Sequence, residues 1–311
     1  MQRRVFLMKL GALATAPLAL NDIARAATQT YDFSPQQNGR VRAPENPAAR
    51  RLAAEYRFVT PGAFSVAISP FAAPLASYAT DARTIVGSEP DYAQLVADAL
   101  GLKLALIPVA WEDWPLGLTS GKYDAVIANV GVTEKRKQKF DFTTYRLGLH
   151  AFYVASKSTI QSIREPKDIA GLRIITGSGT IQERILLEWN QQNVASGLKP
   201  AALQYFEDLT SSVLALQSGR SDAIFNPHAP LAYAAATQGN IRLVGTVNAG
   251  WPLRADVAAA TRKGSGLAAA LTEATNGLIA GGQYRAGLTR WGLQDEAIAH
   301  AQTNPPGYKD A

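Results

Sequence analysis

Two stretches of the chain resemble each other, and this repeat constrains the fold more than any other feature. "LTSGKYDAVIANVGVT" and "LQSGRSDAIFNPHAP" both run from a helix end through Ser-Gly and a basic residue into Asp-Ala and a hydrophobic strand. Around both, runs with strand-like alternation are interleaved with segments at helical spacing, which is typical of α/β proteins with parallel strands and crossover helices. The sequence therefore predicts an α/β fold with two similar lobes.

The expected elements also suggest how the lobes are joined. In the first lobe we expect strands at 64–69, 103–109 and 123–129, and helices at 91–100 and 114–120. The runs 149–155 and 255–261 are our candidates for two strands that link the lobes. We therefore divide the chain into 58–151 (first lobe), 152–257 (second lobe) and 258–295 (return to the first lobe). Strand ends of open sheets would then meet at a shared ligand cleft.

The chain opens with features of an export signal. Arg3 and Arg4 form a basic region, Leu10–Leu20 is apolar, and Ala24-Arg25-Ala26 supplies an A-x-A cleavage site, so we expect a signal peptide at 1–26. The apolar run is too short to span a bilayer. The arginine pair resembles a twin-arginine signal; a general secretory signal with an incidental arginine pair is the alternative.

Charge and cysteine content exclude several classes of function. Removal of the signal lowers the net charge from +6 to +3, which leaves no electrostatic footprint for nucleic acid. The absence of cysteine excludes disulfides, thiolate metal sites and a cysteine nucleophile. The three histidines have no metal spacing: His150, His228 and His300. We expect an exported, periplasmic and monomeric protein without metal, cofactor or catalytic residue.

The ends of the mature chain show no clear periodicity. Residues 27–57 are rich in Pro, Asn, Gln and Arg and predict an irregular leader with a short helix at 48–56. Residues 296–311 predict a polar tail.

The stretch "GVTEKRKQKFDFTTY" (131–145) places four basic residues within five positions: Lys135, Arg136, Lys137 and Lys139. It follows a buried strand, and Thr133 is a good N-cap for a helix. Lys135 and Lys139 would share one helix face, whereas Arg136 is turned about 100° away from Lys135. Either the whole helix is solvated, or Arg136 alone points into the cleft toward an anion.

A family resemblance decides between these readings. "GKYDAVIANVGVTEKRKQKFDFTTY" resembles the signature of the bacterial family 3 solute-binding proteins, the amino-acid-binding components of ABC importers. "IVGSEPDYAQLVADALGLKLALIPVAW", "IREPKDIAGLRIITGSGTIQERIL" and "LQSGRSDAIF" resemble further segments of that family in the same order. The resemblance covers about residues 64–293. It implies a type II periplasmic-binding-protein fold, with two hinge strands and a ligand cleft between the lobes.

The resemblance also implies which residues contact the ligand. Arg136 would pair with the ligand carboxylate, because a guanidinium binds that group in a planar, bidentate way that lysine cannot reproduce. Asn129 and Gly131 end the preceding strand. In the second lobe, helix-start amides would meet the same carboxylate; a plain glycine turn is the alternative for these three residues: Gly179, Thr180 and Ile181. Phe71 and Trp111 are either cleft walls or core residues.

Two departures from the family pattern affect the expected ligand. Members usually carry a hydroxyl residue where this chain has Gly131, and an aspartate that pairs with the ligand's α-ammonium where it has Pro227. We expect Pro227 to be the first residue of a helix capped by Asn226. It cannot compensate a buried ammonium, which is costly to leave unpaired. Asn226 or His228 could accept a hydrogen bond, although His228 can equally be a half-exposed residue of a first turn.

We therefore expect a protein that binds a small carboxylate, such as an amino acid or a derivative, by hinge closure and delivers it to an ABC permease in the inner membrane. An exported enzyme resembling the cyclohexadienyl or prephenate dehydratases is an alternative; Glu89 and Glu112 are the acids we can nominate for it. A ligand-sensing partner of a membrane receptor is a third possibility.

Overall fold

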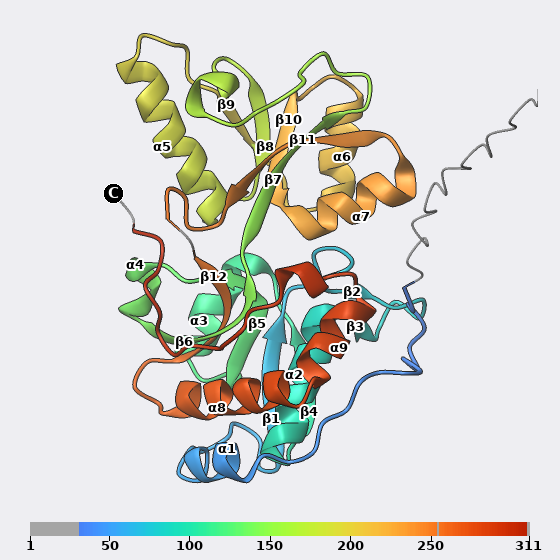
Figure 1. The fold of residues 1–311 in the computed structure, drawn as a ribbon, viewed down its shortest axis with the longest axis vertical. Helices are drawn as coiled ribbons and strands as arrows, with labels where there is room; N and C mark the ends of the chain where they lie inside the picture. Colours follow the sequence, from blue (N-terminus) through green and yellow to red (C-terminus); the bar gives the residue numbers. More distant parts are fainter. Residues whose placement is uncertain (1–30, 254, 310–311) are drawn as a thin grey trace, which may run out of the picture. The chain divides into compact units, whose positions relative to one another are not determined.

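The computed structural model describes residues 31–253 and 255–309. These residues form two α/β lobes, each built around a five-stranded sheet, with the first lobe below and the second above in Figure 1. The α/β class and the two-lobed arrangement expected from the sequence are confirmed. The expected signal at 1–26 lies outside the described residues. In the part of the chain that is described, no helix has the length and apolar character needed to cross a membrane.

The sheet of the first lobe has the strand order β4-β1-β5-β12-β6. β1 (Ala63–Ile68) lies parallel to both β4 (Lys103–Pro108) and β5 (Ala125–Gly131). β12 (Asp256–Arg262) lies antiparallel to β5 and to β6 (Phe140–Leu147). The parallel strands thus come from the first part of the chain, and the antiparallel one returns from the second lobe.

The sheet of the second lobe repeats this plan, with the strand order β9-β8-β10-β7-β11. β8 (Arg173–Thr176) lies parallel to β9 (Ala202–Tyr205) and to β10 (Ala223–Pro227). β7 (Leu149–Ala155) is antiparallel to β10 and to β11 (Ile241–Asn248). In both sheets the fourth strand therefore arrives from the other lobe.

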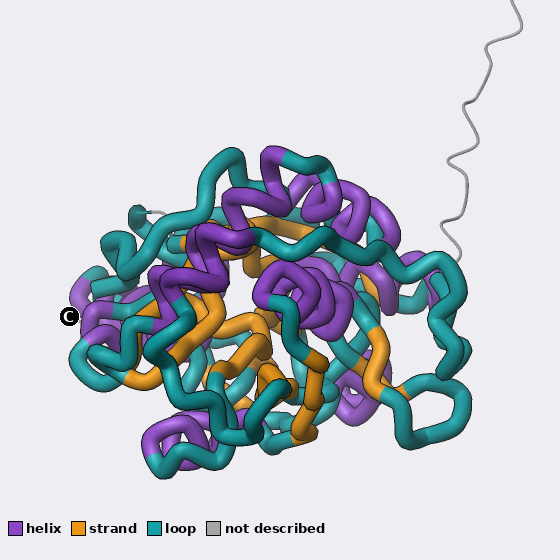
Figure 2. The backbone as a smooth tube through the Cα atoms, turned by 90° about the horizontal axis from the view of Figure 1, so that it is seen from below, coloured by secondary structure: helices purple, strands orange, loops and turns teal. Residues whose placement is uncertain are grey.

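Helices cover the sheets on both faces. In Figure 2 the strands lie near the centre and helices lie around them. In the first lobe, helix α2 begins three residues before the expected start. The helices of this lobe are α1 (Pro47–Leu52), α2 (Ser88–Leu100), α3 (Trp114–Thr119), α4 (Glu134–Lys137), α8 (Leu267–Ala280) and α9 (Gln283–Arg290). A two-stranded ribbon, β2 (Ser77–Tyr78) with β3 (Ile85–Val86), lies ahead of α2. The second lobe contains α5 (Ile181–Ala195), α6 (Leu209–Gln217) and α7 (His228–Gln238).

The chain crosses between the lobes at two places that touch each other. The first crossing is Gly148, between β6 and β7, and the second lies between Asn248 and Asp256. A Cβ atom on Gly148 would lie 2.5 Å from the Cβ of Ala249 and 2.8 Å from the carbonyl oxygen of Ala255. A glycine at 148 therefore lets the two crossing segments pack closely. The expected linking strands, 149–155 and 255–261, correspond to β7 and β12, which follow these crossings.

The repeat noticed in the sequence has a common structural basis. Asp124 and Asp222 each precede the central strand of their sheet, and each backbone amide donates to a neighbouring strand, at Ser65 and Arg173, over 2.9 Å. Each carboxylate accepts the amide of the same neighbour, at 2.9 Å for Ser65 and 2.8 Å for Arg173. The spacing that the two segments share therefore reflects one way of joining the central strand to the strand beside it.

The two chain ends are more ordered than the sequence predicts. Within the expected leader at 27–57, Asn46 caps α1, and its side chain accepts from the amides of Ala48 and Ala49. The sequence predicts a polar tail at 296–311, whereas Ala301 and Tyr308 are both buried. The described parts of both segments, 31–57 and 296–309, therefore pack against the lobes.

The two repeated aspartates provide a matched pair for stability measurements. Asp124 is fully buried and also accepts from the Ser65 hydroxyl, the Tyr56 hydroxyl and the Val59 amide. We expect Asp124→Ala to lower the free energy of unfolding by about 3 kcal/mol, because several buried donors lose their acceptor. Asp222 is partly exposed, so Asp222→Ala should cost only about 1 kcal/mol. Denaturant unfolding followed by circular dichroism measures both; equal losses would contradict this account of the repeat.

Candidate ligand-binding site

A cavity of about 680 Å³ lies between the two lobes. The ends of β5 and β10 face it, as expected for the carboxyl ends of parallel strands. Seven of the residues nominated from the sequence line it: Phe71, Trp111, Asn129, Gly131, Arg136, Thr180 and Ile181. Gly179 and His228 are not lining residues. The cavity therefore brings together most of the predicted site from both lobes.

Arg136 lies in the short helix α4, which begins immediately after β5. Thr133 caps this helix as predicted, because its hydroxyl accepts from the Arg136 amide at 3.0 Å. The guanidinium donates from Nη1 to the carbonyl of Gly131 at 2.9 Å and from Nη2 to the carbonyl of Gly179 in the second lobe at 3.2 Å. Arg136 thus connects the two walls of the cavity.

Two indole rings also contact this guanidinium. Its Cζ lies 5.5 Å from the ring centroid of Trp111 and 5.7 Å from that of Trp114, within the range of cation–π interaction. Trp114 is buried in the core of the first lobe, whereas Trp111 is half-buried and lines the cavity. The rings restrict the orientation of the guanidinium, whose permanent positive charge attracts anions.

The lysines near Arg136 differ in their surroundings. Lys135 and Lys139 are exposed, as expected for a solvated face. Lys137 is half-buried; its ammonium donates to Glu134 at 3.1 Å and to the carbonyl of Pro305 at 3.0 Å. Of these four basic residues, Arg136 alone lines the cavity.

The start of helix α5 forms the opposite wall. Thr180 caps the helix, and its hydroxyl accepts from the Glu183 amide at 3.2 Å. Ile181 reaches across to the first lobe, where a Cβ atom on Gly131 would lie 2.3 Å from its Cδ1. A serine or threonine at 131 would therefore have to displace the Ile181 side chain. The absence of a side chain at Gly131 leaves the space that Ile181 occupies.

Asn129 is held in an unusual conformation beneath the cavity. Its φ is +53°, in the left-handed region that few residues other than glycine adopt. Its amide donates to Glu89 Oε2 at 2.8 Å, and its side-chain oxygen accepts from Arg146. The strained backbone is therefore fixed by two buried charged groups, which turn Asn129 toward the cavity.

Arg146 is the centre of this buried network. It lies 3.5 Å from Glu89 and also pairs with Glu296. Burial raises the pKa of Glu89, while Arg146, the Tyr145 hydroxyl and the Asn129 amide act in the opposite direction. The network joins β5, α2 and the C-terminal segment below the cavity floor. Sequence reasoning missed it, because only the fold brings these distant charges together.

The second-lobe wall around β10 contains neutral groups. Asn226 is buried, and both it and Pro227 line the cavity. Pro227 itself occupies the N-cap position, so helix α7 starts one residue later than predicted and Asn226 is not its cap. His228 lies behind this wall, with Nδ1 3.5 Å from the Tyr153 hydroxyl. The acids that line the cavity are Glu89, which is paired, and two exposed residues, Glu112 and Glu207.

His150 also lines the cavity and was not predicted as a site residue. It lies two residues after the crossing at Gly148, and its ring is perpendicular to Phe225 at 5.8 Å. Neither ring nitrogen has a hydrogen-bond partner among the described residues. Burial, with a smaller contribution from Arg146, lowers its pKa to about 3. The imidazole is therefore neutral at pH 7. A histidine in an otherwise apolar strand was the available sequence signal.

The aromatic residues give the cavity an apolar character. Phe71 and Trp111 belong to the first lobe, and Tyr205 and Phe206 to the second. Within the described ranges, no three His, Cys, Asp or Glu side chains are grouped so that they could hold a metal ion. The site is thus suited to a small organic molecule with an anionic group near Arg136.

The buried side chain of His150 predicts a specific pH dependence of the free energy of unfolding. The pKa of His150 is lower in the folded state than the ordinary value of about 6.5, because the folded protein buries the neutral imidazole. Its contribution to stability is therefore fully present above pH 6.5 and is lost as the pH falls toward 3. We expect the free energy of unfolding to fall by about 1.4 kcal/mol for each pH unit in that range. His150→Phe should flatten this dependence, whereas the control His300→Gln, at an exposed position, should not. An unchanged slope in His150→Phe would contradict the assignment; urea unfolding at several pH values measures it.

Comparisons with known proteins place these features in a family. The profile of the "Bacterial extracellular solute-binding proteins, family 3" matches residues 64–294. The L-cystine-binding protein TcyJ of Escherichia coli (strain K12) is 31% identical over 150 residues, which are 48% of this chain and 53% of that protein. The chain thus matches about half the length of this relative.

Solved structures share the same fold. An ancestral arginine-binding protein bound to arginine is 26% identical, with a TM-score of 0.65 over 74% of this chain and 98% of that one. The ancestral amino acid-binding protein AncCDT-1, a precursor of cyclohexadienyl dehydratase, is 22% identical, with a TM-score of 0.62 over 74% and 95% of the two chains. The chain therefore belongs to the bacterial extracellular solute-binding proteins of family 3.

Proposed function

We propose that this protein is the solute-binding component of an ABC importer and captures a small carboxylate between its lobes. The observation that carries the proposal is Arg136, which lines an interlobe cavity and contacts both walls. Its guanidinium can bind a carboxylate in two parallel hydrogen bonds. The relatives that bind cystine and arginine support an amino acid or a derivative as the ligand class.

The closed arrangement of the cavity supports binding by lobe closure. Arg136 comes from the first lobe and the amides at the start of α5 come from the second, so one carboxylate could contact both. A ligand that touches both walls binds the closed state better than the open one and shifts the population toward it. Delivery to a permease in the inner membrane, after export directed by residues 1–26, completes this proposal.

The neutral wall around Pro227 supports a narrower class of ligand. Among the described residues, no acid lies in the buried part of this wall, and Glu89 is already engaged by Arg146 and two hydrogen bonds. A buried ammonium without a counter-charge is strongly disfavoured. We therefore infer a carboxylate whose α-nitrogen is absent, acylated or otherwise uncharged.

An exported dehydratase on the same fold is the alternative. Glu89 and Glu112 line the cavity, which keeps a general acid geometrically possible. However, Glu89 is buried, accepts from Tyr145 and Asn129 and lies against Arg146, so its carboxyl group is held by the protein. The other two acids that line the cavity, Glu112 and Glu207, are exposed, and Glu112 is the one that the sequence nominated for proton transfer. Incubation with prephenate, followed by phenylpyruvate absorbance, tests this alternative; turnover that Glu112→Gln abolishes would favour the enzyme.

Removal of the guanidinium should abolish binding of carboxylates. We expect Arg136→Ala to weaken the affinity by roughly 30- to 5,000-fold, because truncating one member of a desolvated charge pair costs about 2–5 kcal/mol. Arg136→Lys keeps the charge but loses the bidentate geometry, so it should remain at least tenfold weaker than the wild type. Calorimetry with the carboxylate that gives the largest thermal shift measures both. The adjacent exposed Lys135→Ala is the matched control. Near wild-type affinity in Arg136→Ala would contradict the site assignment.

An added carboxylate at position 227 should change the preferred ligand. Pro227→Asp places an acid on the neutral wall, and aspartate is itself a good N-cap for helix α7. We expect the ratio of affinities for free over N-acetylated amino acids to rise at least tenfold. Pro227→Ala, which removes the proline without adding charge, should leave the ratio unchanged. The idea fails if Pro227→Asp and Pro227→Ala behave alike in a thermal-shift panel.

A further inference from the structure

Two segments outside the family match make contacts that bridge the lobes. The match covers residues 64–294, so 31–63 and 295–309 flank it in the described chain. The C-terminal flank, 295–309, runs along the first lobe to helix α4. The N-terminal flank, 31–63, contacts helices α2 and α9. Each also places aromatic side chains against the second lobe.

The C-terminal flank is hydrogen-bonded to the first lobe beside the cavity. The amide of Asn304 donates to the carbonyl of Phe142 at 2.9 Å, and the amide of Tyr308 donates to the carbonyl of Val132 at 2.9 Å. The carbonyl of Tyr308 in turn accepts from the amide of Glu134 at 2.9 Å. The segment therefore lies along β6, which follows Arg136, and along the helix start that precedes it.

Helix α4 depends on this segment for its position. It has only four residues, too few for a helix that is stable alone. The Glu134 carboxylate accepts from the amide of Gly307 at 2.7 Å, and the Lys137 ammonium donates to the carbonyl of Pro305 at 3.0 Å. Both ends of the helix that carries Arg136 are thus tied to residues 305–307.

Tyr308 extends this attachment to the second lobe. Its ring is 5% exposed and packs in the apolar cluster that contains Ile185 and Trp189 of helix α5. Its hydroxyl donates to Glu188 Oε2 at 3.2 Å. The backbone of Tyr308 is therefore held by the first lobe while its side chain is held by the second.

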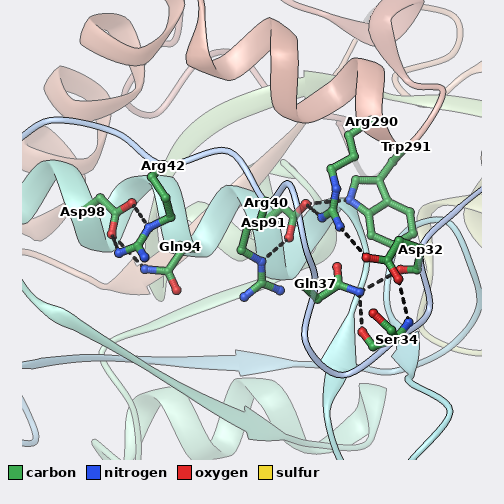
Figure 3. Close-up of polar contacts among 10 residues, drawn as sticks. All are labelled: Asp32, Ser34, Gln37, Arg40, Arg42, Asp91, Gln94, Asp98, Arg290 and Trp291. Atoms are coloured by element: carbon green, nitrogen blue, oxygen red, sulfur yellow. Dashed lines mark hydrogen bonds and ion pairs between the residues drawn. The ribbon is translucent and has the colours of Figure 1, made fainter.

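The N-terminal flank is fixed to the first lobe by charged groups, as Figure 3 shows. Arg40 donates to Asp91 at 2.7 Å, and Arg290 of helix α9 pairs with the same carboxylate. Arg42 pairs with Asp98 at 2.6 Å. These contacts anchor the flank to both α2 and α9.

The start of this flank contacts helix α7 of the second lobe. The Tyr31 ring stacks on Trp291 with centroids 5.8 Å apart and lies 5.2 Å from the ring of Tyr233. Phe33 packs edge-on against the same two rings, at 5.9 Å and 6.1 Å. Trp291 belongs to the first lobe and Tyr233 to α7, so the cluster spans the two lobes.

We propose that these flanks are interlobe straps: Tyr308 on one side, and Tyr31 with Phe33 on the other, hold the lobes together in the absence of ligand, and the C-terminal strap also positions Arg136. Separation of the lobes would expose the Tyr308 ring, break its bond to Glu188 and pull Tyr233 from the aromatic cluster. Because these contacts exist only when the lobes are together, each of them raises the population of the closed state relative to the open state by about two- to tenfold. The straps therefore bias the ligand-free protein toward closure.

This bias has a consequence for binding that rests on the proposed function. If the closed state is the one that binds, a larger closed fraction lowers the apparent Kd by the same factor. The closed bias itself can be measured without any ligand. Failure of the straps and failure of the carboxylate-binding proposal are thus distinguishable.

The test measures the distance between the lobes by pulsed electron paramagnetic resonance. The chain has no cysteine, so spin labels attach only at two introduced sites, Glu112→Cys and Glu207→Cys, which are exposed and line the cavity from opposite lobes. We expect Tyr308→Ala to enlarge the long-distance population two- to tenfold in the ligand-free protein, and Tyr31→Ala with Phe33→Ala to do the same. In the variant that combines all three substitutions, the two increases in the free-energy preference for the open state should add.

Matched variants separate strapping from general destabilisation. Tyr308→Phe keeps the ring and loses only the hydroxyl bond, so its distances should stay closer to the wild type than those of Tyr308→Ala. Glu188→Ala removes the partner of the Tyr308 hydroxyl, and Tyr233→Ala removes the ring that Tyr31 and Phe33 contact. Both variants act from the second lobe, so they test the proposal even if Tyr308→Ala does not fold. Leu214→Ala, at a position 57% exposed, is the control that should change nothing. Unchanged distances in the combined variant, or in both second-lobe variants, would overturn the proposal.

Discussion

The buried charge of Arg146 is the constraint on which the site and the hinge both depend. This guanidinium is 3% exposed and lies two residues before the crossing at Gly148. A buried cation must be paired, and its partners come from three separate parts of the chain: Glu89 on α2, Glu296 near the C-terminus and Asn129 at the end of β5. The same contacts that neutralise Arg146 therefore fix the cavity floor next to the hinge.

This arrangement gives the cavity two chemically different walls. The first lobe supplies a cation, Arg136, whose place is set by a short capped helix and two indole rings. The second lobe supplies helix-start amides and the neutral residues Asn226 and Pro227. An anionic group bound at the first wall can be met by amides when the lobes close, whereas Glu89, the buried acid among the described lining residues, is already held by Arg146. These electrostatics support our proposal that the ligand is a carboxylate without a charged nitrogen.

Much of this could be predicted from sequence because it is encoded locally. The repeat around Asp124 and Asp222 and the Thr133 cap follow from spacing within a few residues, whereas the position of Arg136 in the cleft was expected from the family resemblance. The Arg146 network and His150 could not be found in this way, since burial there depends on residues far apart in sequence. The left-handed backbone of Asn129 and the burial of Tyr308 in a segment of polar composition were equally invisible.

The central claim is that the cavity recognises a carboxylate without a charged α-nitrogen. A thermal-shift panel of free amino acids paired with their N-acetyl derivatives, extended to opines and dicarboxylates, tests it most directly, because ligands that bind only the folded state raise its melting temperature. The account predicts larger shifts for the N-acetylated member of each pair than for the free amino acid. A large shift with free arginine or glutamine, together with none from their N-acetyl forms, would contradict it.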